Sequence, residues 1–303
     1  MSRNVRHYSD MKGGMDRGPK KHISHVVERS GEIMNVASRE VISTHSSNTL
    51  KNAAKLMRDS DVRRLPVIHA GTGKLEGLVT GVDILDFLGG GEKYNILVKD
   101  YSGNFLSAIN CPVSKIMRPS QYLEKTASVE DAARIMLERH SSCIPVIDSA
   151  EKMGVMGIVS ERDILPQGGE LGVPVEKVMN RRPIAATPGM MLSDVSKVMV
   201  RNQMRRLPVI SEGGLQGIVT VFDVLGFLGD GNYKGVDAEE NLSTRVQELM
   251  EENVIAVSPE DDLGSVVDLI RDSGIGGFPV TAGERLVGIV TTTDILWWIY
   301  GQK

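Results

Sequence analysis

The chain has 303 residues, 41% of them apolar, and a formal net charge of −4. That length is enough to bury substantial hydrophobic cores and, at roughly 150 residues per domain, corresponds to about two domains. The two cysteines are too few for a disulfide framework, no secretory signal is recognisable, and no apolar run reaches the roughly 18 residues of a membrane span. These features argue against a disulfide-rich secreted protein and a membrane protein, so we expect a soluble protein of the cytoplasm.

Residues 1–32 form a basic segment in which Lys and Arg outnumber the acidic residues and apolar residues show almost no periodicity. This composition is typical of a flexible tail. An arm that binds nucleic acid or a protein partner is the alternative. The negative charge of the whole chain argues against nucleic-acid binding elsewhere, because such binding ordinarily needs an excess of Lys and Arg.

One pattern occurs four times along the chain. It consists of glycine, an apolar residue, valine, serine or threonine, two variable residues, aspartate, an apolar residue and leucine, and it begins at Gly77, Gly157, Gly217 and Gly288. A pattern repeated in this way indicates a repeat protein and not a single-copy active site. Glycine at its first position permits close approach of another backbone or an irregularity in a strand.

Each copy belongs to a unit predicted to contain strand, helix, strand, strand and helix. In the first unit a short strand at 41–44 precedes a helix with one apolar face, formed by Leu50, Ala53, Ala54 and Met57. A proline-centred apolar run at 65–68 starts the next strand, and a glycine-rich turn joins it to a strand at 75–80. The last helix opens at the repeated pattern, and the other three units follow the same order.

The units are expected to pair, because 50 to 60 residues bury only about 60% of their unfolded surface. The sequence Arg-Arg-Leu-Pro-Val-Ile at 63–68 returns at 205–210, in the third unit, which indicates that a pair of units is duplicated. We therefore predict an α/β protein built of α+β repeats. Its first module spans 33–165, with units at 33–88 and 113–165, and its second spans 175–303, with units at 175–228 and 246–300.

The repeated aspartate suits a nucleotide site. A carboxylate can accept hydrogen bonds from both vicinal hydroxyls of a ribose, a role open to Asp83, Asp163, Asp223 and Asp294. The preceding hydroxyl lies at the start of a helix, where it can donate to ribose or phosphate, and belongs to Thr80, Ser160, Thr220 and Thr291. The alternative for both residues is a helix capping box, which can coexist with binding.

Arginine pairs occur in alternate units only, as Arg63 and Arg64 in the first and Arg205 and Arg206 in the third. A charge-assisted hydrogen bond to phosphate contributes about 1.5 to 3 kcal/mol, or a tenfold to hundredfold change in affinity. We therefore predict that phosphate contacts differ between clefts. Solvated surface arginines are the alternative.

With four such units, the chain resembles the cystathionine-β-synthase (CBS) domain family, and within it the archaeal homologues of the γ subunit of AMP-activated protein kinase. The resemblance implies two pseudo-twofold Bateman modules, with a disc as one arrangement, whose clefts bind adenosine-containing ligands. It implies composite sites that join Asp163 to Arg63 or Arg64, and Asp294 to Arg205 or Arg206. Adenine would lie near the first strand of a unit, such as residues 42–44.

We therefore expect a regulatory protein without catalytic activity, cofactor or metal site, because no nucleophile with a recognisable base is present. Its expected ligands are AMP, ADP or ATP, and its expected partner is a protein target regulated in trans. A sensor of S-adenosylmethionine or a related nucleoside is one alternative, and a nucleic-acid-linked regulator that uses the tail is another. The two modules could also meet across a homodimer.

Overall fold

The structure is a computed structural model that describes residues 6–7, 33–212 and 214–301. The predicted tail therefore lies outside the described residues except for Arg6 and His7. These two residues form strand β1 (Arg6–His7), which pairs in parallel with strand β9 (Ile255–Ala256). The Arg6 backbone N–H donates to the Val254 carbonyl at 3.0 Å. This part of the predicted flexible tail is thus attached to the fourth unit.

The described chain contains four units of similar structure, each of which starts with a short 3₁₀ turn. The turns are η1 (Ile33–Asn35), η4 (Val113–Lys115), η5 (Val175–Lys177) and η6 (Val246–Glu248). Unit one continues with α2 (Leu50–Asp59), β2 (Arg64–Ile68), β3 (Leu75–Thr80), α3 (Gly81–Leu85) and the π-helical turn η2 (Asp86–Gly90). Unit two contains β4 (Leu123–Glu124), α5 (Val129–Glu138), β5 (Cys143–Ile147) and β6 (Val155–Ser160).

The second half of the chain repeats this order. Unit three contains α6 (Leu192–Arg201), β7 (Arg206–Ser211), β8 (Gly214–Thr220) and α7 (Val221–Gly229). Unit four contains β9, α9 (Leu263–Ser273), β10 (Gly277–Ala282), β11 (Arg285–Thr291) and α10 (Thr292–Tyr300). The connectors within each half hold η3 (Ile96–Asp100) with α4 (Phe105–Ile109), and α8 (Ala238–Leu242).

Two predicted elements are wrong in detail. The first strand of a unit is reduced to one or two residues, as at Thr44, whose N–H donates to the Pro66 carbonyl at 3.0 Å and forms a single parallel bridge to Val67. In unit two the repeated pattern opens one turn and no helix. Pro166 follows that turn and lacks the N–H that a continuing helix needs, which accounts for the difference.

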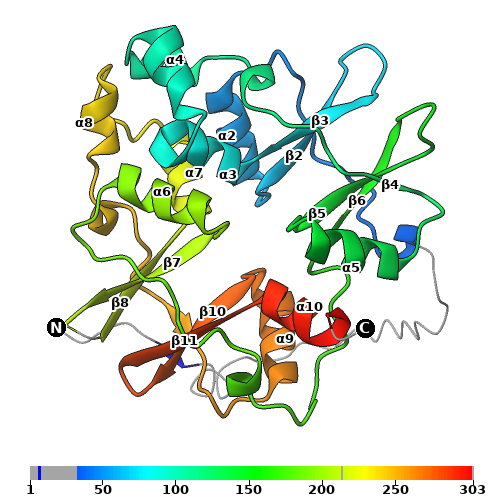
Figure 1. Ribbon diagram of the computed structural model, residues 1–303, viewed down its shortest axis with the longest axis vertical. Coiled ribbons are helices and arrows are strands. Elements are labelled where there is room, and N and C mark those ends of the chain that lie inside the picture. Colours follow the sequence, from blue (N-terminus) through cyan, green and yellow to red (C-terminus); the bar gives the residue numbers. More distant parts are fainter. Residues whose placement is uncertain (1–5, 8–32, 213, 302–303) are drawn as a thin grey trace.

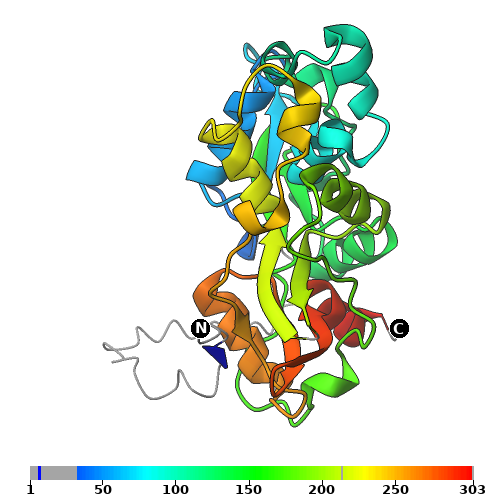
Figure 2. The ribbon, with the colours of Figure 1, turned by 90° about the vertical axis from the view of Figure 1, so that its left-hand side faces the viewer.

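The four units form a flattened ring, broad in Figure 1 and thin in Figure 2. Units of one pair exchange backbone bridges, which join Leu78 to Arg118, Ile158 to Ser38, Ile218 to Glu251 and Ile289 to Asn180. Units of different pairs meet through helices, with α2 against α7, η2 against α6, and α5 against α10. One hydrophobic core accordingly spans units one and three, and a second spans units two and four.

The glycine of the repeated pattern is explained by these exchanges. It lies opposite the residue where each hairpin shifts register, as in the pairing of Gly77 with Val67. A Cβ atom on Gly77 would lie 2.7 Å from the Arg118 carbonyl oxygen, which belongs to the partner unit. Both predicted reasons for glycine, close backbone approach and strand irregularity, are confirmed, and both concern the pairing of units.

We expect Gly77→Ala to destabilise the protein by about 1 to 3 kcal/mol, because backbone atoms must move to relieve the overlap. Urea unfolding measures the change. Gly71→Ala in the turn of the same hairpin is the matched control, since its Cβ would meet only the His69 ring at 3.5 Å. Equal stability of the two variants would contradict the packing role of the glycine.

Candidate functional site

The four repeated aspartates occupy the same local geometry. In each unit the Ser or Thr hydroxyl donates to one carboxylate oxygen, Oδ2, at distances of 2.6 Å in unit one, 2.7 Å in unit two, 2.8 Å in unit three and 2.6 Å in unit four. The backbone N–H of the same Ser or Thr donates to that oxygen as well. Three of the four form complete capping boxes, in α3, α7 and α10.

This geometry separates the two predicted roles of the aspartate. The Oδ2 atom serves the cap, and the Oδ1 atom of Asp163, Asp223 and Asp294 has no hydrogen-bond or ion-pair partner within the described residues. The hydroxyl donates to the carboxylate in each unit, so its predicted donation to a ligand stays a prediction. In units two, three and four the capping interaction leaves Oδ1 of the aspartate as an acceptor.

Unit one differs, because both oxygens of Asp83 are engaged. The Lys93 ammonium forms an ion pair with Oδ1, and the Arg118 Nε atom lies 3.6 Å from Oδ2. Lys93 belongs to the connector between units one and two. It reaches Asp83 because the connector folds back over the helix that Asp83 caps.

Burial affects the acidity of two of the free carboxylates. It raises the pKa of Asp294, against the opposing effect of hydrogen bonds from Thr291. It likewise raises the pKa of Asp223. A raised carboxyl pKa means that the ionised form is less stable at this place than in water, because burial removes the water that would stabilise its charge.

Arginines from three units gather at the centre of the ring, and most of them contact a different unit. Arg64 donates to the Ser142 hydroxyl, Arg205 to Glu161 Oε2 at 2.9 Å, and Arg206 to the Gly277 carbonyl. Arg162 donates to the Gly274 carbonyl at 3.0 Å, and the guanidinium carbon of Arg63 lies 4.6 Å from the centre of the Phe222 ring.

Glu161 is the buried carboxylate among these guanidinium groups. Burial opposes its ionisation, but the charge of Arg205 and a 2.7 Å hydrogen bond from the Thr293 hydroxyl hold the pKa of Glu161 below its usual value. Burial, followed by the charges of Arg206 and Arg205, lowers the pKa of Arg63 to about 8. The centre therefore carries excess positive charge that a bound anion would stabilise.

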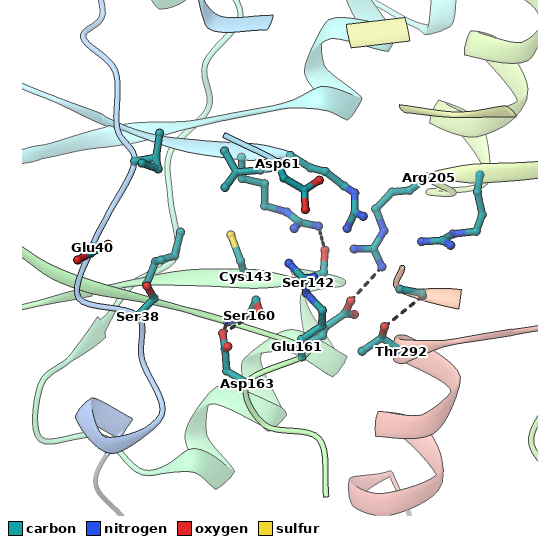
Figure 3. Close-up of a pocket in the computed structure, with 18 residues that line it drawn as sticks. Ser38, Glu40, Asp61, Ser142, Cys143, Ser160, Glu161, Asp163, Arg205 and Thr292 are labelled. Atoms are coloured by element: carbon teal, nitrogen blue, oxygen red, sulfur yellow. Dashed lines mark hydrogen bonds and ion pairs between the residues drawn. The ribbon is translucent and has the colours of Figure 1, made fainter. Parts of the chain in front are cut away.

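Two cavities open onto this centre. The first, of about 320 Å³, brings Ser160 and Asp163 of unit two together with Ile42, Arg63 and Arg64 of unit one. Figure 3 shows Asp163 beside Ser160 and, in the same cavity, Glu161 directed toward Arg205. The structure thus places together the residues expected for the first composite site, with part of the segment expected to face adenine.

The second cavity, of about 520 Å³, joins Thr80 and Asp83 of unit one to Arg118 and Arg139. It shares with the first cavity Arg63, Arg64, Ser142, Glu161 and Arg205. Charge introduced into one cavity is therefore close to residues that line the other.

The remaining predicted site residues, in units three and four, are not gathered in one cavity. Arg205 approaches the start of α10, where its guanidinium donates to the Thr293 hydroxyl at 3.3 Å, next to Asp294. Arg206 is only 8% exposed and is held by the Gly277 carbonyl, so it also supports the contact between units three and four. Thr291 and Asp294 line neither central cavity, and Thr220 and Asp223 do not line them either.

Sequence reasoning missed Glu161, Lys93 and Arg118. Glu161 could have been noticed by comparing the four copies, because the same position holds Gly81, Val221 and Thr292 in the others. Arg118 carried no such signal, since its role follows from the pairing of two units. Within the described residues, no His, Cys, Asp and Glu side chains gather as a metal site, and no helix there is long and apolar enough to span a bilayer.

Comparisons with known proteins agree with this architecture. The CBS domain family matches residues 31–90, 113–167, 175–230 and 246–301. The uncharacterised protein MJ1225 of Methanocaldococcus jannaschii is 34% identical over 275 residues, which cover 87% of this chain and 97% of the relative. Its crystal structure, described as that of a candidate archaeal homologue of γ-AMPK, gives a TM-score of 0.78 with 31% identity and covers 88% of this chain and 99% of that one.

A more distant relative is the 5′-AMP-activated protein kinase subunit gamma of Saccharomyces cerevisiae, which is 23% identical over 295 residues that cover 89% of each chain. The four family matches coincide with the four structural units and cover most of the chain. The predicted fold class and resemblance are confirmed. The chain therefore belongs to the CBS domain family and carries four CBS units paired into two modules.

Proposed function

We propose that this protein binds adenine nucleotides, AMP, ADP or ATP, in clefts between its paired CBS units and thereby reports the energy state of the cell to a protein target. One observation carries the proposal. A carboxylate with a free Oδ1 atom, that of Asp163, shares a cavity with the paired guanidinium groups of Arg63 and Arg64. A ribose diol and a phosphate require these two groups in one place.

The proposed role is regulatory, because the cleft offers binding groups and lacks the parts of a catalytic centre. The cleft carboxylate is suited to act as an ionised acceptor, and Glu161 is neutralised by Arg205. Proteins with CBS units are generally regulatory, and the likeness to MJ1225 and to the yeast kinase subunit supports the choice of ligand.

Phosphate number is the property that such a protein would sense. Arg64, Arg162, Arg205 and Arg206 each hold a contact to another unit. A longer phosphate chain reaches further into this group and competes for more of these contacts. A nucleotide can shift the arrangement of the modules only by binding one arrangement better than another. The contacts of Arg162 and Arg205, which join units of different modules, supply that difference.

We expect Asp163→Asn to weaken nucleotide binding at its cleft by about tenfold to a hundredfold. The amide is neutral and has one acceptor oxygen in place of two, so it cannot accept both ribose hydrogen bonds with the strength of the carboxylate. Calorimetric titration with ATP, ADP, AMP and S-adenosylmethionine measures the change and the preferred ligand. Asp131→Asn is the matched control, because Asp131 caps α5 through Ser128 in the same way and lies outside both central cavities.

Saturable binding of S-adenosylmethionine alone would replace the proposed ligand class, because that molecule has no phosphate for the arginines. Binding of all nucleotides with unchanged affinity in Asp163→Asn would contradict the assignment of the cleft.

Anions should stabilise the folded protein in order of phosphate number. The excess positive charge at the centre, reflected in the lowered pKa of Arg63, is relieved by a bound polyanion. We expect the melting temperature to rise more with ATP than with AMP, and least with adenosine, when all are present at the same free concentration, because the ligand with the lower dissociation constant stabilises more. An equal rise with adenosine and ATP would show that phosphate does not reach the arginines.

Nucleoside binding at the composite site proposed for Asp294 should weaken as the pH falls. Burial raises the pKa of Asp294, so as pH falls its carboxylate is protonated before an ordinary Asp and loses its capacity to accept ribose hydrogen bonds. The stability of the folded protein should change in the opposite direction and rise as the pH falls, because protonation removes the cost of a buried charge. Adenosine is the ligand to use as the pH is lowered, since it has no phosphate group, whose second ionisation near pKa ~6 would add to the change. In Asp294→Asn this part of the pH dependence should disappear, and its persistence would assign it to another group.

A further inference from the structure

The carboxylate of unit one is already satisfied by the protein itself. Asp83 is buried, with 5% of its side chain exposed, and its ion-pair partner Lys93 has 22% of its side chain exposed. The ammonium binds Oδ1, while Oδ2 accepts from the Thr80 N–H at 2.8 Å and the Thr80 hydroxyl at 2.6 Å. Both oxygens of this carboxylate are engaged, so a ribose diol would find no free oxygen atom and would have to compete with the Lys93 ammonium for Oδ1.

The connector explains how the lysine is held in place. The Asp86 carboxylate accepts from the Lys93 N–H at 2.9 Å, and Gly89, with φ of 101°, turns the chain back toward Asp83. In the matching connector of unit three, Gly226 replaces Asp86 and cannot anchor the chain in this way. Tyr233 stands in place of Lys93 there, and the next residue, Lys234, lies 3.2 Å from Glu248 instead of reaching Asp223.

The partner unit adds a second difference between the surroundings of Asp83 and those of the other three repeated aspartates. The residue that bridges to each hairpin from the partner unit is Arg118 opposite unit one, and the others are Ser38, Glu251 and Asn180. Arg118 alone among these four is cationic, and it lies 3.6 Å from the Asp83 carboxylate. Two cations therefore face Asp83, and within the described residues none forms an ion pair with Asp163, Asp223 or Asp294.

We propose that Lys93 closes the cleft of unit one to nucleosides by standing in for the ribose hydroxyls, so that no more than three clefts of the chain bind nucleotide. This inference rests on the proposed function. A ribose would have to break a buried ion pair and leave the ammonium without its partner, and two neutral hydroxyl donors do not replace that interaction. Asp83 then serves to fix the connector and cap α3.

The test counts bound nucleotides per chain by equilibrium dialysis with labelled ATP, checked by native mass spectrometry. Lys93→Met keeps the apolar stem and removes the charge, and we expect it to bind one more nucleotide per chain than the unchanged protein. Lys234→Met, in the matching connector of unit three, should leave the number unchanged. The double variant with Lys93→Met and Asp83→Asn should return to the original number.

Asp83→Asn in the otherwise unchanged protein gives a second, independent measurement. We expect it to leave the number of bound nucleotides unchanged, whereas Asp163→Asn should lower it. Loss of one nucleotide in Asp83→Asn, or no gain in a folded Lys93→Met, would overturn the closure of this cleft. If the unchanged protein binds no nucleotide, the proposed function fails, and the two failures are thereby distinguished.

Discussion

The structure depends on one constraint: the fold brings several positively charged side chains together at the centre of the ring. The proline-centred strands of units one and three begin at the centre of the ring, so the arginine pairs that start them are forced together. Guanidinium groups repel one another in a buried setting, and Glu161 is the carboxylate buried among them. The arginines are held there by hydrogen bonds to neighbouring units, which makes the same side chains responsible for assembly and for the charge that attracts an anion.

Because the same arginines contact other units and provide the positive charge, an anion bound to them would change how the units are arranged. Helix packing between the pairs buries apolar side chains and does not depend on ligand charge, whereas the contacts of Arg64 and Arg205 are polar and lie in the shared wall of two cavities. A phosphate that draws either guanidinium away weakens a contact between units and leaves the hydrophobic contacts in place. Loss of the Arg205 contact, which joins the two modules, is expected to shift their angle or separation within an intact fold, whereas loss of the Arg64 contact acts between the two units of the first module.

The sequence predicted what depends on neighbours along the chain. The apolar face of α2, the proline-centred strands and the capping boxes of α3, α7 and α10 follow from local spacing, and all are present. The prediction of a last helix in unit two was wrong, because Pro166 prevents the turn from continuing as a helix. Pro166 is a local signal, but the helix was predicted from the similarity of the four units. The role of Arg118 could not be predicted, since its position opposite Asp83 arises only when two units exchange backbone bridges.

Four nearly identical caps therefore do not make four equivalent sites. The bridging position holds Arg118 opposite unit one, Ser38 opposite unit two, Glu251 opposite unit three and Asn180 opposite unit four, all outside the repeated pattern. Arg118 lies 3.6 Å from the Asp83 carboxylate. Glu251 adds to the effect of burial in raising the pKa of Asp223, and a carboxylate at that place also repels phosphate. Because the backbone bridge is kept while the side chain at the bridging position changes, the four repeated aspartates lie in surroundings of different charge.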